Sequence, residues 1–135
     1  MEERIQCAIE LYKAGYNCSQ AVCAAFADLY GYTREQALKM SASFGGGIGR
    51  MRMTCGAACG MFILAGLESG CTQAGDPKGK EENYRVVKYL ASQFIARNSS
   101  LICSEIVASR KHPCTKTVEE AARIWAGYLT KTADE

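Results

Sequence analysis

The sequence lacks the features that define several large protein classes. Its most apolar stretch, residues 57–67, is far too short to span a bilayer. The first residues are acidic and lead into an amphipathic run, so there is no pattern of a secretory signal. We therefore expect a cytoplasmic protein without a membrane partner. The net charge of +2 is spread over 135 residues, which argues against a nucleic-acid partner.

Motifs of familiar enzymes and metal proteins are also missing. There is no C-x-x-C pair, which argues against a zinc ribbon or a thioredoxin-like centre, and no C-x-x-C-H for covalent haem. No G-K-[ST] follows the glycines at 45–49, and no nucleophile elbow indicates a hydrolase. The single histidine, His112, could tune or ligate a metal beside Cys114, but a solvated loop histidine is the simpler interpretation.

What is present is a helical pattern of apolar residues. We expect helices over residues 3–15, 18–31, 33–43, 55–69, 79–97 and 102–109, and a last helix from 117 onward. No segment has the two-residue period of a strand. The expected fold is all-α: one domain, 1–135, built as an irregular bundle of about six to seven helices around a buried central helix, 55–69. The spacing directs the following side chains to the core: Ile5, Ala8, Ile9, Tyr12, Val22, Ala25, Phe26, Leu29, Tyr84, Val87, Leu90, Ala91, Phe94, Val118, Ala121, Ala122, Trp125, Tyr128 and Leu129.

Local signals mark where several of these helices begin. Asn17 with Gln20 three residues later, Thr33 with Gln36, and Thr117 with Glu120 have the spacing of capping boxes. Thr54 is the expected cap of the central helix. The glycine-rich segment 45–50 cannot be regular structure, because glycines at that density indicate unusual backbone angles or a close backbone approach.

Eight cysteines are the most informative residues of the chain. In a reducing cytosol, metal binding or thiol chemistry is a better explanation for them than structural disulfides. Cys7, Cys23 and Cys59 fall inside expected helices, where we expect each to pack as a small apolar side chain. Cys71 lies in an expected surface loop, and its role stays open.

The other four cysteines fall at helix starts or in loops. Cys18 and Cys55 each follow an expected cap, where free N–H groups and the helix dipole favour a thiolate and lower the pKa of the thiol. Cys103 begins the expected short helix, and Cys114 lies in the loop before the last one. All four sulfurs could converge on one site.

Three segments together resemble a known family. They are Asn17-Cys18-Ser19-Gln20-Ala21-Val22, Phe44-Gly45-Gly46-Gly47-Ile48-Gly49-Arg50 and Cys55-Gly56-Ala57-Ala58-Cys59-Gly60. In this order they resemble the redox-active proteins defined by a C-G-A-x-x-G motif and four cysteines, often called the C-GCAxxG-C-C family. The resemblance assigns the family cysteines to Cys18, Cys55, Cys103 and Cys114. It also implies a relation to the C-terminal domain of split-Soret cytochromes, in which cysteines hold an iron–sulfur cluster. Cys59 departs from the commonest form of the motif.

Three functions follow as alternatives. The first is an iron–sulfur protein in electron transfer or redox sensing, with the four family cysteines as ligands. The second is a thiol oxidoreductase in which Cys55 attacks a disulfide or oxidant. The third is a structural zinc module. Gly45, Gly46 and Gly47 would bring backbone N–H groups to the Cys55 sulfur, and Arg50 would add positive charge or form a surface salt bridge.

The expected partners follow from these alternatives. A redox protein would exchange electrons or thiols with a partner protein, a small thiol or an oxidant. A homodimer stays open, because nothing in the sequence decides the oligomeric state.

Overall fold

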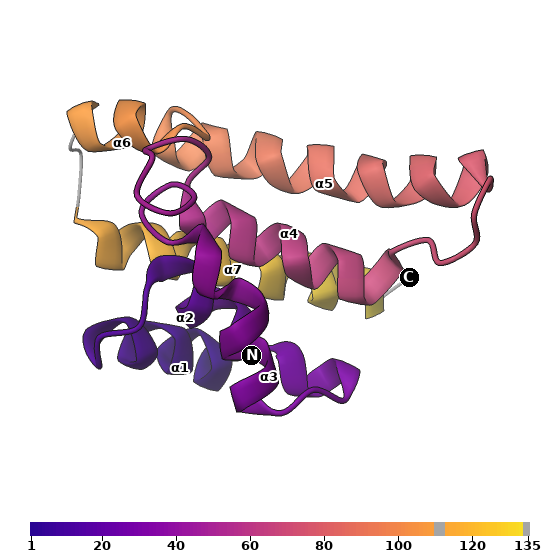
Figure 1. Ribbon diagram of the computed structural model, residues 1–135, viewed down its shortest axis with the longest axis horizontal. Coiled ribbons are helices and arrows are strands. Elements are labelled where there is room, and N and C mark those ends of the chain that lie inside the picture. Colours follow the sequence, from indigo (N-terminus) through magenta and orange to yellow (C-terminus); the bar gives the residue numbers. More distant parts are fainter. Residues whose placement is uncertain (110–112, 134–135) are drawn as a thin grey trace.

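The all-α fold is confirmed. A computed structural model describes residues 1–109 and 113–133, and within these ranges it has seven α-helices and no strand (Figure 1). The helices are α1 Glu2–Lys13, α2 Cys18–Ala24, α3 Arg34–Ser41, α4 Gly56–Ser69, α5 Pro77–Asn98, α6 Cys103–Ser109 and α7 Cys114–Ala133. Two 3₁₀ turns, Ala27–Tyr30 and Ala42–Phe44, precede and follow α3. None of the described helices is long and apolar enough to cross a membrane.

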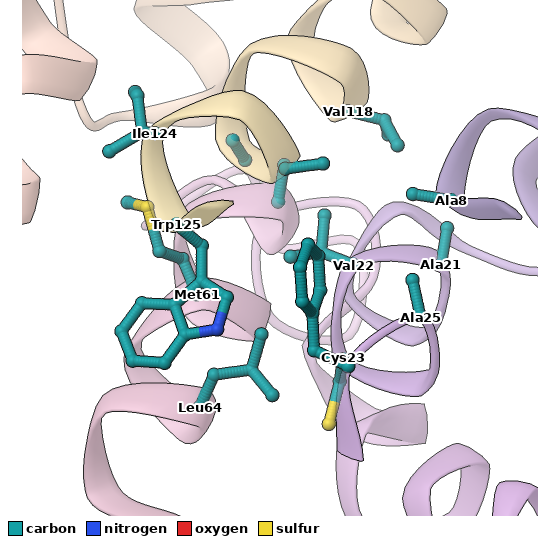
Figure 2. Close-up of a cluster of buried hydrophobic side chains, with 14 of the residues drawn as sticks. Ala8, Ala21, Val22, Cys23, Ala25, Met61, Leu64, Val118, Ile124 and Trp125 are labelled. Atoms are coloured by element: carbon teal, nitrogen blue, oxygen red, sulfur yellow. The ribbon is translucent and has the colours of Figure 1, made fainter. Parts of the chain in front are cut away.

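Helix α4 lies at the centre of the bundle, as expected. It contacts α2, α5 and α7, while α1 packs against α2 and α7 on the far side (Figure 1). Residues 56–61 of α4 are all buried. Figure 2 shows side chains of α2, α4 and α7 meeting in the core, with Trp125 of α7 beside Met61 and Leu64 of α4. The N-terminal ends of α2 and α4 are thereby fixed beside each other.

Two of the three predicted capping boxes are present. The Asn17 side chain accepts a hydrogen bond from the Gln20 backbone N–H at 2.9 Å, and the Gln20 side chain accepts one from the Asn17 N–H at 3.1 Å. Thr33 and Gln36 make the same pair of bonds at the start of α3. The expected Thr54 cap is wrong: the N-cap of α4 is Cys55, and no side chain caps this helix.

Two predicted core side chains are exposed instead. The expected helix 18–31 ends at Ala24, and a 3₁₀ turn with a tighter period follows, so Leu29 rotates outward and is 45% exposed. Tyr84 is 58% exposed, because α5 lies at the edge of the bundle and buries only a narrow stripe that includes Leu90 and Phe94. The last helix also begins earlier than predicted, at Cys114, so this cysteine is part of the helix. The predicted Thr117 cap is therefore wrong, because Thr117 lies within the first turn of α7.

The glycine-rich segment forms a left-handed turn. Residues 46–50 all have positive φ, from +55° to +73°, and Arg52 has φ of +60°. Backbone hydrogen bonds hold the turn: the N–H of Arg50 donates to Gly45 O at 3.1 Å and that of Met53 to Gly47 O at 2.9 Å. This conformation costs about 1–2 kcal/mol for each residue with a side chain, here Ile48, Arg50 and Arg52. The predicted unusual backbone angles are therefore confirmed.

The turn is tied to the start of α6, which lies beside it in Figure 1. Cys103 N–H donates to Met53 O at 2.6 Å, and Cys55 N–H donates to Leu101 O at 2.7 Å. An isolated bridge joins Thr54 and Ile102. Residues almost fifty positions apart are thus fixed side by side, and each pair includes or adjoins a cysteine.

Candidate redox site

The four helix-start cysteines line one cavity. Its volume is about 450 Å³, and it opens between the N-terminal ends of α2, α4, α6 and α7. Each of these helices, or its N-cap, supplies one cysteine, namely Cys18, Cys55, Cys103 and Cys114. The structure therefore brings the four predicted cysteines to the lining of one cavity. The remaining lining residues are Tyr12, Gly15, Tyr16, Asn17, Gly46, Gly47, Arg50, Arg52, Gly56, Ile106, Val107 and Thr117.

The left-handed turn forms one wall of this cavity. A β-carbon on Gly47 would lie 2.6 Å from the Cys103 β-carbon, so only glycine permits this approach. Gly45 is equally close to the Asn17 side chain, where a β-carbon would again lie 2.6 Å away. The Gly46 N–H hydrogen-bonds to the Cys18 sulfur. The turn therefore serves Cys18 and Cys103, which corrects the expectation that its N–H groups reach Cys55.

The two arginines of the turn occupy different positions relative to the sulfurs. Arg52 Nη1 lies 3.7 Å from the Cys103 sulfur, while Arg50 lines the cavity without a contact to sulfur among the described residues. The described lining contains these two charged side chains and no carboxylate. The site therefore has a positive character that stabilises bound thiolates or an anionic group.

Burial keeps the deep thiols protonated. It raises the pKa of Cys55 to about 12, although backbone N–H groups of Ala58 and Ala57 partly oppose the rise. Burial also raises the pKa of Cys18, against the hydrogen bonds from Gly46 and Ser19. The predicted lowering of both pKa values is thus wrong, because loss of hydration outweighs the helix-start N–H groups.

Comparison with known families identifies the family of the chain. The profile of the family described as "Putative redox-active protein (C_GCAxxG_C_C)" matches residues 16–128. The chain belongs to this family. The membership of this family that the sequence indicates is thereby confirmed, and the chain is a cysteine-based redox protein. No curated protein and no solved structure matches it.

The matched range contains all four cysteines that line the cavity, together with the left-handed turn. Within residues 1–109 and 113–133, no three or more His, Cys, Asp or Glu side chains are grouped to hold a metal ion. His112 lies outside the described residues. The family cysteines thus share a cavity but are not drawn together around a single point.

The other cysteines have distinct surroundings. Cys23 is fully buried in the core, as predicted, whereas Cys7 is only half-buried, with Arg34 Nη2 at 3.3 Å from its sulfur. Cys71 lies in the loop before α5, where its thiol donates to Gln73 O at 3.3 Å. Cys59 is buried one helical turn after Cys55. Its pKa is raised to about 11, mainly by burial and to a smaller extent by the nearby Cys18 sulfur. Cys59 therefore borders the site without lining it.

Sequence reasoning missed several residues of the cavity. Tyr12 was assigned to the core, yet it lines the cavity, and its pKa is raised by burial and by the neighbouring Cys114 and Cys18 sulfurs. Arg52 carries no signal in the sequence, and Thr117 is predicted only as a helix cap. No motif distinguishes Arg52 from Arg50, and only the direction of the left-handed turn determines which guanidinium reaches a sulfur.

Proposed function

We propose that the chain holds an iron–sulfur cluster through Cys18, Cys55, Cys103 and Cys114 and acts in electron transfer or redox sensing. The observation that carries this proposal is that four cysteines from separate helix starts line one cavity of about 450 Å³. Four cysteine thiolates are the usual ligand set of such clusters. The cavity is many times the roughly 30 Å³ that one water molecule occupies, so a polynuclear group has room.

The size of the shared cavity favours a cluster over a single zinc ion. One zinc would require all its sulfurs at about 2.3 Å from the same point. A cluster separates its thiolates, because several metal ions and bridging sulfides lie between them. The shared cavity therefore supports a cluster more than a mononuclear site.

Thiol exchange by Cys55 is the less supported alternative. With a pKa of about 12, very little of this thiol is ionised at neutral pH, and the thiolate is the reactive form. A bound metal ion displaces the proton of its thiol ligand, so the raised pKa opposes metal binding less than it opposes thiol exchange. Cys55 in this proposal is therefore a ligand and not a nucleophile.

Other residues of the cavity would tune the potential of the cluster or shape the cavity wall. The bound cluster would supply one-electron transfer. Gly46 N–H donates to the Cys18 sulfur, and Arg52 places positive charge beside Cys103. Hydrogen bonds to the sulfurs and nearby charge are the means by which proteins set the potential of such a group. Gly45 and Gly47 let the wall approach Asn17 and Cys103, and Arg50 adds charge at the edge.

The test is purification without oxygen, followed by iron and acid-labile sulfide analysis and visible absorption. We expect a coloured protein that contains both. Cys→Ser at 18, 55, 103 or 114 should each remove most of the iron, whereas Cys7→Ser, outside the cavity, should retain it. Colourless protein, zinc without sulfide, or equal losses in the Cys7→Ser control would contradict the proposal.

A further inference from the structure

Two large apolar side chains at the end of the left-handed turn are exposed to solvent. Met51 is 62% exposed and Met53 is 52% exposed. Neither lines the cavity, although both of their arginine neighbours do. Exposed apolar side chains beside a functional site indicate a contact surface, and methionine adapts well to partner surfaces.

Positive charge surrounds these methionines. Arg50 and Arg52 alternate with them along the chain and lie at the mouth of the cavity. Neither arginine forms an ion pair in the part of the chain that the structure describes, whereas Arg4, Arg97 and Arg123 each do. Two unpaired guanidinium groups beside two apolar side chains form a surface that attracts carboxylates and then excludes water.

The backbone presents this surface in a fixed form. The positive φ of Arg50 and Arg52 is held by hydrogen bonds within the turn and by the bonds of Cys103 and Ser104 N–H groups to Met53 and Arg52 carbonyl oxygens. A strained conformation that its surroundings maintain at a site is an indication of function. Little conformational entropy is then lost when a partner docks.

We propose that residues 50–53 are the docking surface for an acidic redox protein, which covers the mouth of the cysteine cavity. This inference rests on the proposed redox function of the cavity. A small anion could fill the cavity and contact the arginines, but it would not cover Met51 or Met53, which are exposed and do not line the cavity. Only a partner with an extended surface can contact both the two arginines and the two methionines. Such a surface has carboxylates beside apolar residues.

The test measures binding, not electron transfer, so that it does not depend on the cluster. An acidic plant-type [2Fe–2S] ferredoxin is titrated into the protein by calorimetry, at low salt and again at high salt. We expect binding that weakens strongly with salt, and about tenfold weaker binding for Arg50→Glu and for the double variant Met51→Ser, Met53→Ser.

The matched controls are Arg85→Glu and Tyr84→Ser, which change exposed residues of α5 that do not line the cysteine cavity. These should bind within about twofold of the wild type. Ferredoxin with amidated carboxylates should not bind. Equal effects of the control variants, undiminished binding of amidated ferredoxin, or no binding by the wild type would overturn the proposal. Iron content, measured separately, shows whether the cluster itself is present in each variant.

Discussion

The sulfur of Cys18 occupies the space that a side chain on Gly56 would need. The same β-carbon would also lie 2.7 Å from the carbonyl oxygen of Phe44. Gly56 is the first residue of α4, and Cys18 is the first residue of α2. The two helix starts that bring Cys18 beside Cys55 therefore meet only because position 56 has no side chain.

We expect Gly56→Ala to destabilise the protein by about 1–3 kcal/mol, because the methyl group must displace the sulfur or the backbone. The variant should also retain less iron after anaerobic purification. Gly66→Ala in the same helix is the matched control: its β-carbon would meet nothing within 4 Å. Its greater helix propensity should raise stability by up to about 1 kcal/mol. Urea unfolding under reducing conditions measures both. Equal changes in the two variants would contradict the close packing of Cys18 on Gly56.

The capping residues provide a second prediction. Asn17→Ala and Thr33→Ala each remove a capping box, and each should cost about 1 kcal/mol of stability. Asn17 also donates to Ala42 O at 3.0 Å and lines the cysteine cavity, whereas Thr33 does not. We therefore expect reduced iron content in Asn17→Ala alone. Iron analysis beside thermal unfolding separates the two effects, and an equal loss of iron in Thr33→Ala would place the site elsewhere.

A third prediction concerns stability at alkaline pH. Burial raises the pKa of Cys23 to about 11, against a hydrogen bond with Ser41. The unfolded chain loses this proton near pH 8.5, and the folded chain keeps it to about pH 11. The stabilising effect of the neutral thiol is thus complete below pH 8.5 and declines by about 1.4 kcal/mol per pH unit above it.

Cys23→Ala should be less stable than the wild type at pH 8, because it leaves a cavity in the core. As the pH rises toward 11, this difference should shrink, because the variant has no thiol to titrate at that position. Denaturant unfolding of the metal-free protein with reductant, at several pH values, measures the difference. A constant difference would contradict the raised pKa.

The features predicted correctly are those that short stretches of sequence determine. Asn17 and Gln20 lie three residues apart, so their capping box depends on one helical turn. The helix starts at Cys18 and Cys103 were found for the same reason. The helical spacing of Val118, Ala121 and Trp125 was likewise enough to predict which side of α7 is buried.

The features that were missed depend on the assembled fold. The pKa of Cys55 is raised by burial in the assembled bundle, and no local signal in the sequence tells how far water is excluded from this thiol. Leu29 is exposed because a 3₁₀ turn changes the period after Ala24. The contact of Arg52 with Cys103 depends on a left-handed turn. Rules that infer side-chain direction from residue spacing assume right-handed helices or extended strands, so they do not apply to this turn.

The origin of the four cavity cysteines in separate helices has a consequence for the lifetime of the protein. Cys18 and Cys114 belong to opposite ends of the described chain, and a group bound to all four would link those ends. Such a group binds the folded chain and not the unfolded one, so it stabilises the fold by mass action. Loss of the group would let the helices separate more often and expose the chain to proteases. Occupancy of the cavity would then control how long each molecule survives, as well as what it does.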